Sequence, residues 1–177
     1  MTSASFSTLV AIFKRYSTKS ATKMETLTIS QYELERGKPV PRLRHSILQH
    51  RLDVAFARYD AQFSILPEID LELGGKLFVP DVCVYPKQQV SWVGEEGPMR
   101  EPPLLAVEIL SQSQTMEQLF SRAQAYLDAG TSSVWLVVPP AQTVFVLKPN
   151  AKPQPFTTGI IKDERTGIEL NVEELFK

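Results

Sequence analysis

Two acidic residues, Asp81 and Glu108, stand inside otherwise apolar stretches of the chain. Asp81 lies in the run 77–85, and Glu108 lies in the run 104–110. Both runs are short and rich in β-branched or aromatic residues, which is typical of buried strands. A carboxylate is costly to bury unless a cation or several hydrogen-bond donors compensate its charge. The chemistry of this chain therefore depends on what compensates these two acids.

If the two strands are neighbours, the carboxylates can face each other, with Cβ atoms roughly 5 Å apart. At that range they repel unless one is protonated or a cation lies between them. Oxygen-only ligands suit Mg²⁺ or Mn²⁺, and such an ion can activate water and stabilise charge on a phosphate. The alternative is that one acid pairs with Arg122 while the other faces solvent at a strand end, where Pro80 marks an edge.

A helix over residues 43–59 is predicted before these strands, because apolar residues recur there at helical spacing. Arg44, Arg51 and Arg58 are spaced by seven, so they form one line beside the apolar stripe. Two interpretations stay open for this line. The arginines lie along the surface or form ion pairs there, or they form a row of contacts to nucleic-acid phosphates. The residues of the apolar stripe are Leu48, Leu52, Ala55, Phe56 and Tyr59.

A second helix is predicted over 116–128, between the Glu108 strand and a strand at 134–138. Residues 111–115 supply capping side chains, and Gly130 is a natural stop. A strand–helix–strand unit pairs its strands in parallel, with a right-handed crossover. Arg122 falls at the edge of the buried arc of this helix, from where it can bring a positive charge to the sheet.

The rest of the chain supplies short elements around this unit. We expect a helical turn and a small strand pair over 25–41, and strands over 61–67 and 69–73. The Asp81 run should form one strand over 77–85, followed by an exposed loop at 86–103. The final part should hold an edge strand at 143–147, a loop at 149–166, and a short strand and helical turn at 167–176.

Size and composition indicate one soluble domain with a well-formed core: 177 residues, 43% hydrophobic, 22% charged, net charge −1. The single Cys83 excludes an intrachain disulfide framework, and no apolar run is long enough to span a membrane. We expect a cytoplasmic protein whose domain covers 25–177. Residues 1–24 contain no acid and are rich in Lys, Arg, Ser and Thr. They are either a targeting-like segment or an extension or loose tail before Met24.

The ordered set of motifs resembles the PD-(D/E)XK restriction-endonuclease-like superfamily. The match is closest to its branch of small bacterial proteins called putative restriction endonucleases, which are common in cyanobacteria. The resemblance covers roughly residues 25–148. It is carried by Tyr32-Glu33-Leu34 with Gly37, Arg44-His45, Pro80-Asp81, Val107-Glu108-Ile109-Leu110-Ser111-Gln112-Ser113, and Tyr126 with Ala129-Gly130 before a Trp-Leu-Val strand.

The resemblance implies an α/β (α+β) fold with a mixed sheet flanked by helices, and a metal-dependent endonuclease acting on nucleic acid, DNA in the first place. It implies that Mg²⁺ or Mn²⁺ is held by Asp81, Glu108 and the backbone carbonyl of Ile109, with Glu33 matching an upstream acid that completes the site. Because nucleases that cut both strands of a duplex often dimerise, it also leaves room for a homodimer.

The chain departs from the superfamily pattern at its lysine. The usual position holds Leu110, and the position in the helix to which this branch moves the lysine holds Arg122. An acid often seen earlier in that helix is matched by Gln118, with Glu117 beside it. Arginine cannot give up its proton, but it can hold a phosphate bidentately.

Three hypotheses follow from these matches and departures. In the first, the chain is a nuclease with Asp81, Glu108 and Arg122 as catalytic residues. In the second, it is a catalytically degenerate member that binds nucleic acid or a protein through the same groove. In the third, it is a structural homodimer in which Asp81 pairs with Arg122.

Overall fold

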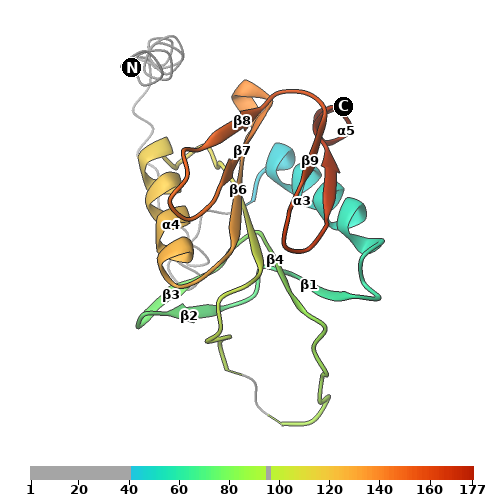
Figure 1. Cartoon of the computed structure of the whole chain (residues 1–177), viewed down its shortest axis with the longest axis vertical. Coiled ribbons are helices and arrows are strands. Elements are labelled where there is room, and N and C mark those ends of the chain that lie inside the picture. Colours follow the sequence, from blue (N-terminus) through green and yellow to red (C-terminus); the bar gives the residue numbers. More distant parts are fainter. Residues whose placement is uncertain (1–40, 95–96) are drawn as a thin grey trace. The chain divides into compact units, whose positions relative to one another are not determined.

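The computed structural model describes residues 41–94 and 97–177, which all belong to one compact unit. Its centre is a six-stranded sheet in the order β1-β4-β5-β6-β7-β8 (Figure 1). β5 and β6 are parallel, and every other neighbouring pair in this sheet is antiparallel. The predicted mixed sheet is therefore confirmed. Its strands are β1 (Phe63–Pro67), β4 (Val82–Pro86), β5 (Leu105–Ile109), β6 (Ser133–Val138), β7 (Thr143–Leu147) and β8 (Gln154–Phe156).

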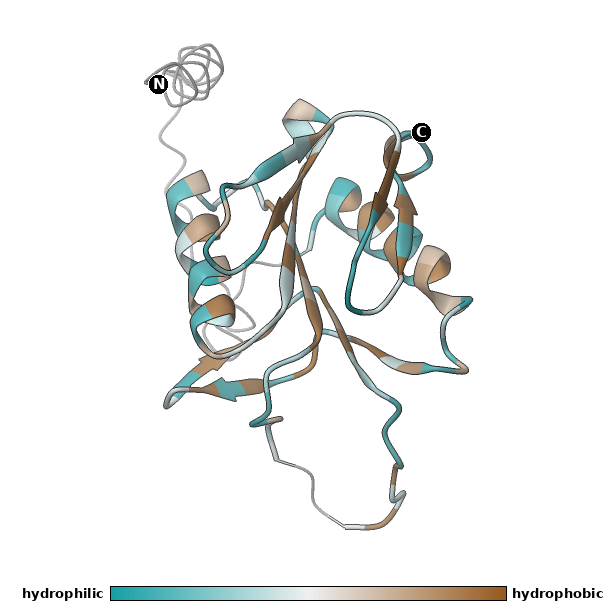
Figure 2. Ribbon diagram, in the orientation of Figure 1, coloured by the Kyte–Doolittle hydropathy of each residue, from teal (hydrophilic) through white to brown (hydrophobic). Residues whose placement is uncertain are grey.

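Helices α3 (Leu43–Ala57) and α4 (Met116–Asp128) contribute to the cores on opposite faces of this sheet. Side chains alternate along each strand, so that one set packs with α3 and the next with α4. The α3 side includes Val82, Val84, Leu105 and Val107, and the α4 side includes Cys83, Ala106, Val134 and Leu136. Figure 2 shows the central strands as the most apolar part of the fold.

The predicted strand–helix–strand unit is present as β5, α4 and β6. α4 begins with a capping box, in which the Thr115 hydroxyl accepts from the Gln118 N–H (3.2 Å) and the Gln118 side chain accepts from the Thr115 N–H (2.9 Å). Gly130 follows the helix with φ of 109°, a conformation that favours glycine. Local sequence signals therefore fix both ends of the helix that carries Arg122.

The predicted strand 77–85 is wrong as a single element. β3 (Lys76–Phe78) pairs with β2 (Leu71–Leu73) in a separate two-stranded sheet, and β4 begins only at Val82. Pro80 lies in the break, where its missing N–H cannot contribute to a ladder. Asp81 therefore stands immediately before a strand rather than inside one.

The predicted loop over 149–166 is also wrong, because it contains β8 and β9 (Ile160–Lys162). β8 pairs with β7, so β7 is an inner strand, and Pro155 is tolerated because β8 is the edge. β9 pairs with β10 (Glu169–Asn171), and the chain ends in helix α5 (Val172–Phe176). A 3₁₀ turn, Pro139–Ala141, joins β6 to β7.

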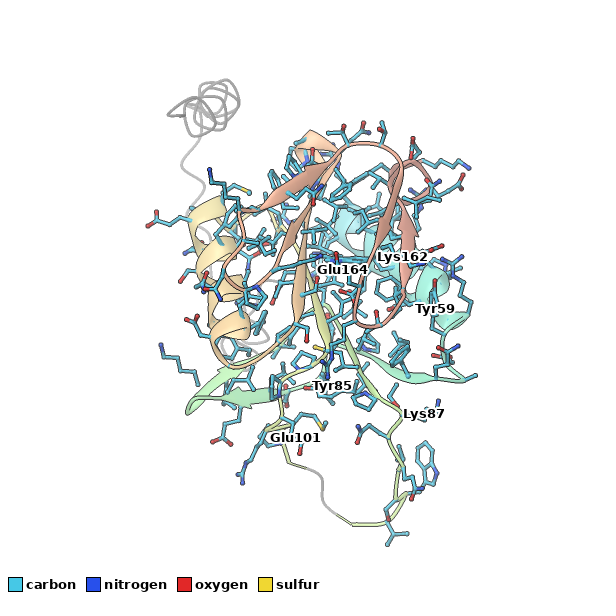
Figure 3. All side chains as sticks on the ribbon, viewed as in Figure 1. Tyr59, Tyr85, Lys87, Glu101, Lys162 and Glu164 are labelled. Atoms are coloured by element: carbon cyan, nitrogen blue, oxygen red, sulfur yellow. The ribbon has the colours of Figure 1, made fainter. Side chains whose placement is uncertain are left out.

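The long connection between β4 and β5 is held at its base. The Tyr85 hydroxyl donates to the carbonyl of Glu101 (2.8 Å), and the Lys87 ammonium donates to the carbonyl of Asp60 (Figure 3). Farther along, Trp92 is almost fully exposed. The predicted exposed loop is confirmed for residues 87–94, whereas Met99 forms a bridge with Leu71 and Pro103 is buried. The turn and strand pair predicted over 25–41 lie almost wholly outside the described residues.

Candidate active site

Asp81 and Glu108 come from adjoining ends of two neighbouring strands. β4 and β5 are antiparallel, with Val82 opposite Val107, and the Asp81 N–H donates to the Val107 carbonyl (3.1 Å). Asp81 is 0% exposed and Glu108 is 1% exposed. The alternative in which one acid faces solvent is therefore wrong.

Asp81 is held from β5 and from α3. Its Oδ2 accepts a 2.6 Å hydrogen bond from the backbone N–H of Ile109, in the position where a strand would offer a main-chain acceptor. Its Oδ1 lies 3.1 Å from Nε2 of the buried His45, within the distance of an ion pair. Gln49, one helical turn further on, donates to the main-chain carbonyl of Asp81 (3.3 Å). Side chain and backbone of Asp81 are thus both fixed.

Glu108 is held from α4. Its Oε1 accepts from the Tyr126 hydroxyl at 2.5 Å and lies 3.3 Å from Nη1 of Arg122. Arg122 and Tyr126 are four residues apart, so they project from one face of the helix. Phe78 packs edge-on against the Tyr126 ring, with centroids 5.2 Å apart, and thereby fixes the ring that orients Glu108.

Both carboxylates act on the same guanidinium. Burial lowers the pKa of Arg122, but the charges of Glu108 and, more weakly, Asp81 contribute to a net upward shift. Burial, followed by the charge of Glu108, raises the pKa of Tyr126 far above its ordinary value. Arg122 therefore stays positive and Tyr126 stays protonated at any physiological pH.

Arg122 pairs with Glu108, which agrees with the interpretation that one of the two acids pairs with this arginine. Arg122 donates a hydrogen bond to Glu108, whereas the structural-homodimer hypothesis assumed that it pairs with Asp81. Sequence reasoning from charge alone missed His45 and Tyr126. The available signal was spacing: His45 falls three residues before Leu48 on the buried face of α3, and Tyr126 falls four residues after Arg122.

The donor chemistry of this site fits a hard divalent cation. Asp81 and Glu108 offer carboxylate oxygens, the ligands that Mg²⁺ and Mn²⁺ prefer. Within residues 41–94 and 97–177, no group of three or more His, Cys, Asp or Glu side chains is gathered in a way that could hold a metal ion. A third protein ligand would have to be the carbonyl of Ile109 or an acid elsewhere. Glu33, the acid predicted for that role, lies outside the described residues.

The line of arginines on α3 divides into two kinds. Arg51 donates to the carbonyl of Leu175 (2.9 Å), and Arg58 donates to the carbonyl of Glu169 (2.8 Å). Arg44 is exposed. Contact of the row with phosphates stays a prediction, and two of its members already hold the C-terminal segment.

Comparison with known proteins relates the chain first to a solved fold and then to a family. The chain shares its fold with a solved structure of a putative nuclease belonging to DUF820 from Anabaena variabilis, which superposes with a TM-score of 0.70. That structure is 24% identical in sequence, and the match covers 78% of this chain and 83% of that chain.

The chain belongs to the Uma2 family, described as putative restriction endonucleases, whose model matches residues 21–174. The predicted resemblance and fold class are thereby confirmed. Comparison with curated proteins gives no match. Within the described part of the chain, no helix is both long and apolar enough to cross a membrane.

Proposed function

We propose that this protein is a metal-dependent endonuclease that hydrolyses phosphodiester bonds in nucleic acid, with DNA as the first candidate. The observation that carries the proposal is the pair of buried acids, Asp81 and Glu108, at adjoining strand ends with the guanidinium of Arg122 in the field of both. Membership of a family of putative restriction endonucleases supports nuclease chemistry at this position.

The residues of the site would have different roles in metal binding. Asp81, Glu108 and the carbonyl of Ile109 would hold Mg²⁺ or Mn²⁺, with Glu33 as a further ligand. When bound, such an ion supplies Lewis acidity and lowers the pKa of a coordinated water. His45 orients the Asp81 carboxylate through its 3.1 Å contact. A contact of this kind holds a ligand side chain in one orientation before a metal binds.

Arg122 would contact the scissile phosphate rather than deprotonate water. Its guanidinium stays charged, so it cannot act as a general base. It can offer two N–H groups to phosphate oxygens and stabilise the charge that develops there. Away from the acids, the row of Arg44, Arg51 and Arg58 is our candidate contact with the phosphate backbone. Arg44 is its strongest member, because Arg51 and Arg58 already donate to carbonyls.

The test is cleavage of duplex DNA, single-stranded DNA and RNA by the purified full chain, with Mg²⁺ or Mn²⁺ and with chelator. We expect Asp81→Ala and Glu108→Ala each to lower the rate by about two orders of magnitude or more. Glu164→Ala, at an exposed acid on the β9–β10 turn, is the matched control and should cut normally. Wild-type rates in both site variants would refute the proposal.

A second candidate is a degenerate member that binds nucleic acid or a protein without cutting. The observation that favours it is the arginine at position 122, where a lysine would be expected, together with its existing bond to Glu108. Arg122→Lys separates the two candidates. If the wild type does not cut and this variant does, the wild-type site keeps its arrangement and lacks only the lysine that cleavage needs. Metal-dependent cleavage by the wild type excludes this candidate.

A further inference from the structure

Arg122 brings a permanent positive charge to the two buried acids. Its Nη1 lies 3.3 Å from Oε1 of Glu108, and the charge of Asp81 also acts on its guanidinium. By contrast, the hydroxyl of Tyr126 and the main-chain N–H of Ile109 are neutral donors. Because a buried carboxylate is costly without a compensating charge, the guanidinium is part of what allows both acids to be buried.

A divalent cation at this site would compensate the same two carboxylates. Asp81 is 0% exposed and Glu108 is 1% exposed, so water screens the charges around them only weakly. A guanidinium and a metal ion at the same pair of acids repel each other, and Arg122 already uses part of the attraction that the acids would offer to the ion. The charge of Arg122 therefore opposes cation binding.

The contact between Arg122 and Glu108 is suited to exchange with another acceptor. Its length of 3.3 Å exceeds the about 2.7–2.9 Å that is usual for a hydrogen bond between charged groups. The side chain of Arg122 is 21% exposed and that of Glu108 is 1% exposed, so a ligand can reach the guanidinium without uncovering the acid. The same Oε1 accepts the shorter bond from Tyr126, which holds the carboxylate when the guanidinium turns away.

We propose that Arg122 is the resident counter-ion of Asp81 and Glu108 and that it couples the binding of a divalent cation to the binding of a nucleic-acid phosphate. This inference rests on the proposed function. While the guanidinium faces the acids, it weakens their affinity for a cation. A phosphate that accepts its N–H groups takes up part of its positive charge, so the affinity of the acids for the cation rises. By linkage, the cation raises the affinity for the phosphate by the same factor.

The sign of one substitution separates this role from a supporting one. If Arg122 only oriented Glu108 for a metal, its removal would weaken metal binding by about 10–100-fold, as the loss of such supporting contacts typically does. Removal of a counter-ion has the opposite effect, because it leaves negative charge that a cation can compensate. Arg122→Gln keeps N–H donors at this position and removes only the charge, so it isolates the electrostatic effect.

Calorimetric titration of the full chain with Mn²⁺ measures that sign. We expect Arg122→Gln to bind Mn²⁺ about tenfold more tightly than the wild type, which lies within the range of typical couplings between sites. Arg122→Lys keeps the charge and should stay close to the wild type. Arg100→Gln is the matched control and should leave Mn²⁺ affinity unchanged, because Arg100 also lies 3.3 Å from a carboxylate, that of Glu72, but is 76% exposed.

The same titration in the presence of saturating duplex DNA tests the coupling. The duplex carries phosphorothioate links, which resist hydrolysis. It should tighten Mn²⁺ binding by the wild type more than by Arg122→Gln, because the variant has no charge to withdraw from the acids. The wild-type measurement does not depend on the folding of any variant. If DNA leaves the Mn²⁺ affinity of the wild type unchanged, the coupling is refuted.

Two further outcomes separate this inference from the proposed function. Equal or weaker Mn²⁺ binding by Arg122→Gln, with cooperative thermal unfolding retained, would overturn the counter-ion role and leave the nuclease proposal standing. If neither the wild type nor Arg122→Gln binds Mn²⁺, with or without DNA, the metal-dependent function itself is wrong, and the counter-ion role is overturned with it.

Discussion

At the scale of single residues, the two buried acids are compensated in different ways. Asp81 uses a main-chain N–H and an imidazole, whereas Glu108 uses a hydroxyl and a guanidinium. Each acid therefore has its own set of partners. The need for compensation and the role of Arg122 were predictable from the sequence. His45 and Tyr126 stand in the motifs that carry the resemblance, but their contacts with the acids were not predictable, since either fits equally well as an ordinary core residue.

Tyr126→Phe should lower the unfolding free energy by more than the loss of a single hydroxyl group usually does. It removes the hydroxyl that donates to a buried charged acceptor, which costs about 1.5–3 kcal/mol of unfolding free energy. Denaturant unfolding at neutral pH measures the loss. Tyr85→Phe is the matched control, because Tyr85 is equally buried but donates to a neutral carbonyl. Equal losses in the two variants would mean that the charge of Glu108 does not strengthen this bond.

The same tyrosines predict a loss of stability in alkali. Burial raises the pKa of both Tyr126 and Tyr85 above the ordinary value of 10.0. Above that pH the unfolded chain gives up protons that the folded chain keeps, so each tyrosine lowers the unfolding free energy by about 1.4 kcal/mol per pH unit. Unfolding measured from neutral pH to well above pH 10.0 should show this decline, and the decline should be shallower in the double variant Tyr85→Phe, Tyr126→Phe.

At the scale of elements, α3 joins the core to the candidate site. His45→Ala removes the side chain that orients Asp81, and the loss of such supporting contacts typically weakens metal binding by about 10–100-fold. Calorimetric titration with Mn²⁺ measures this effect independently of cleavage. His50→Ala, at an exposed histidine of the same helix, should bind Mn²⁺ normally. If His45→Ala lowers the melting temperature but leaves Mn²⁺ affinity unchanged, the contact is structural only.

The capping box of α4 predicts a local effect on stability. Thr115→Ala leaves the Gln118 N–H without its acceptor, which should cost about 1 kcal/mol of unfolding free energy. Thermal or denaturant unfolding measures the change. Ser121→Ala, at an exposed position inside the same helix, changes a hydroxyl without touching a cap and should be neutral or slightly stabilising. A neutral Thr115→Ala would contradict the capping role.

Elements with long periodic patterns were predictable, and short or interrupted ones were not. α3 and α4 each show several turns of helical spacing, and α4 carries stop and start signals as well. The run 77–85 has the composition of one strand, and only tertiary pairing divides it at Pro80 between two sheets. β8 and β9 are three residues each, too short for alternation to distinguish them from a loop.

At the scale of the whole molecule, the arginine line on α3 connects the helix to the C-terminal segment. Arg51→Ala should lower the unfolding free energy by about 1 kcal/mol, because it removes a hydrogen bond to the carbonyl of Leu175. Arg44→Ala should leave stability unchanged but weaken nucleic-acid binding and reduce its salt dependence by about one ion. Denaturation and salt titration measure the two effects. If Arg51→Ala and Arg44→Ala lose DNA affinity equally, Arg51 also contacts phosphates, contrary to this prediction.

The arrangement of the sheet followed from the resemblance and the strand–helix–strand rule rather than from local pattern. Pairing between β4 and β5 could be guessed only because the two acids needed a shared environment. The sequence alone did not predict that the outer face of α3 is apolar and exposed. Leu43, Ile47 and Val54 look like further core positions until the coordinates show that a different face of the helix is buried.

The Asp81 carboxylate completes the edge of β5 by accepting the N–H of Ile109. Natural selection for folding alone would therefore keep an aspartate at this position, even in a descendant that had stopped cutting anything. An aspartate at this position in a relative would consequently be poor evidence that the relative is active. The side chain of Glu108 is bonded to side chains of α4, so a relative that lacks this glutamate would give better evidence that catalytic activity has been lost.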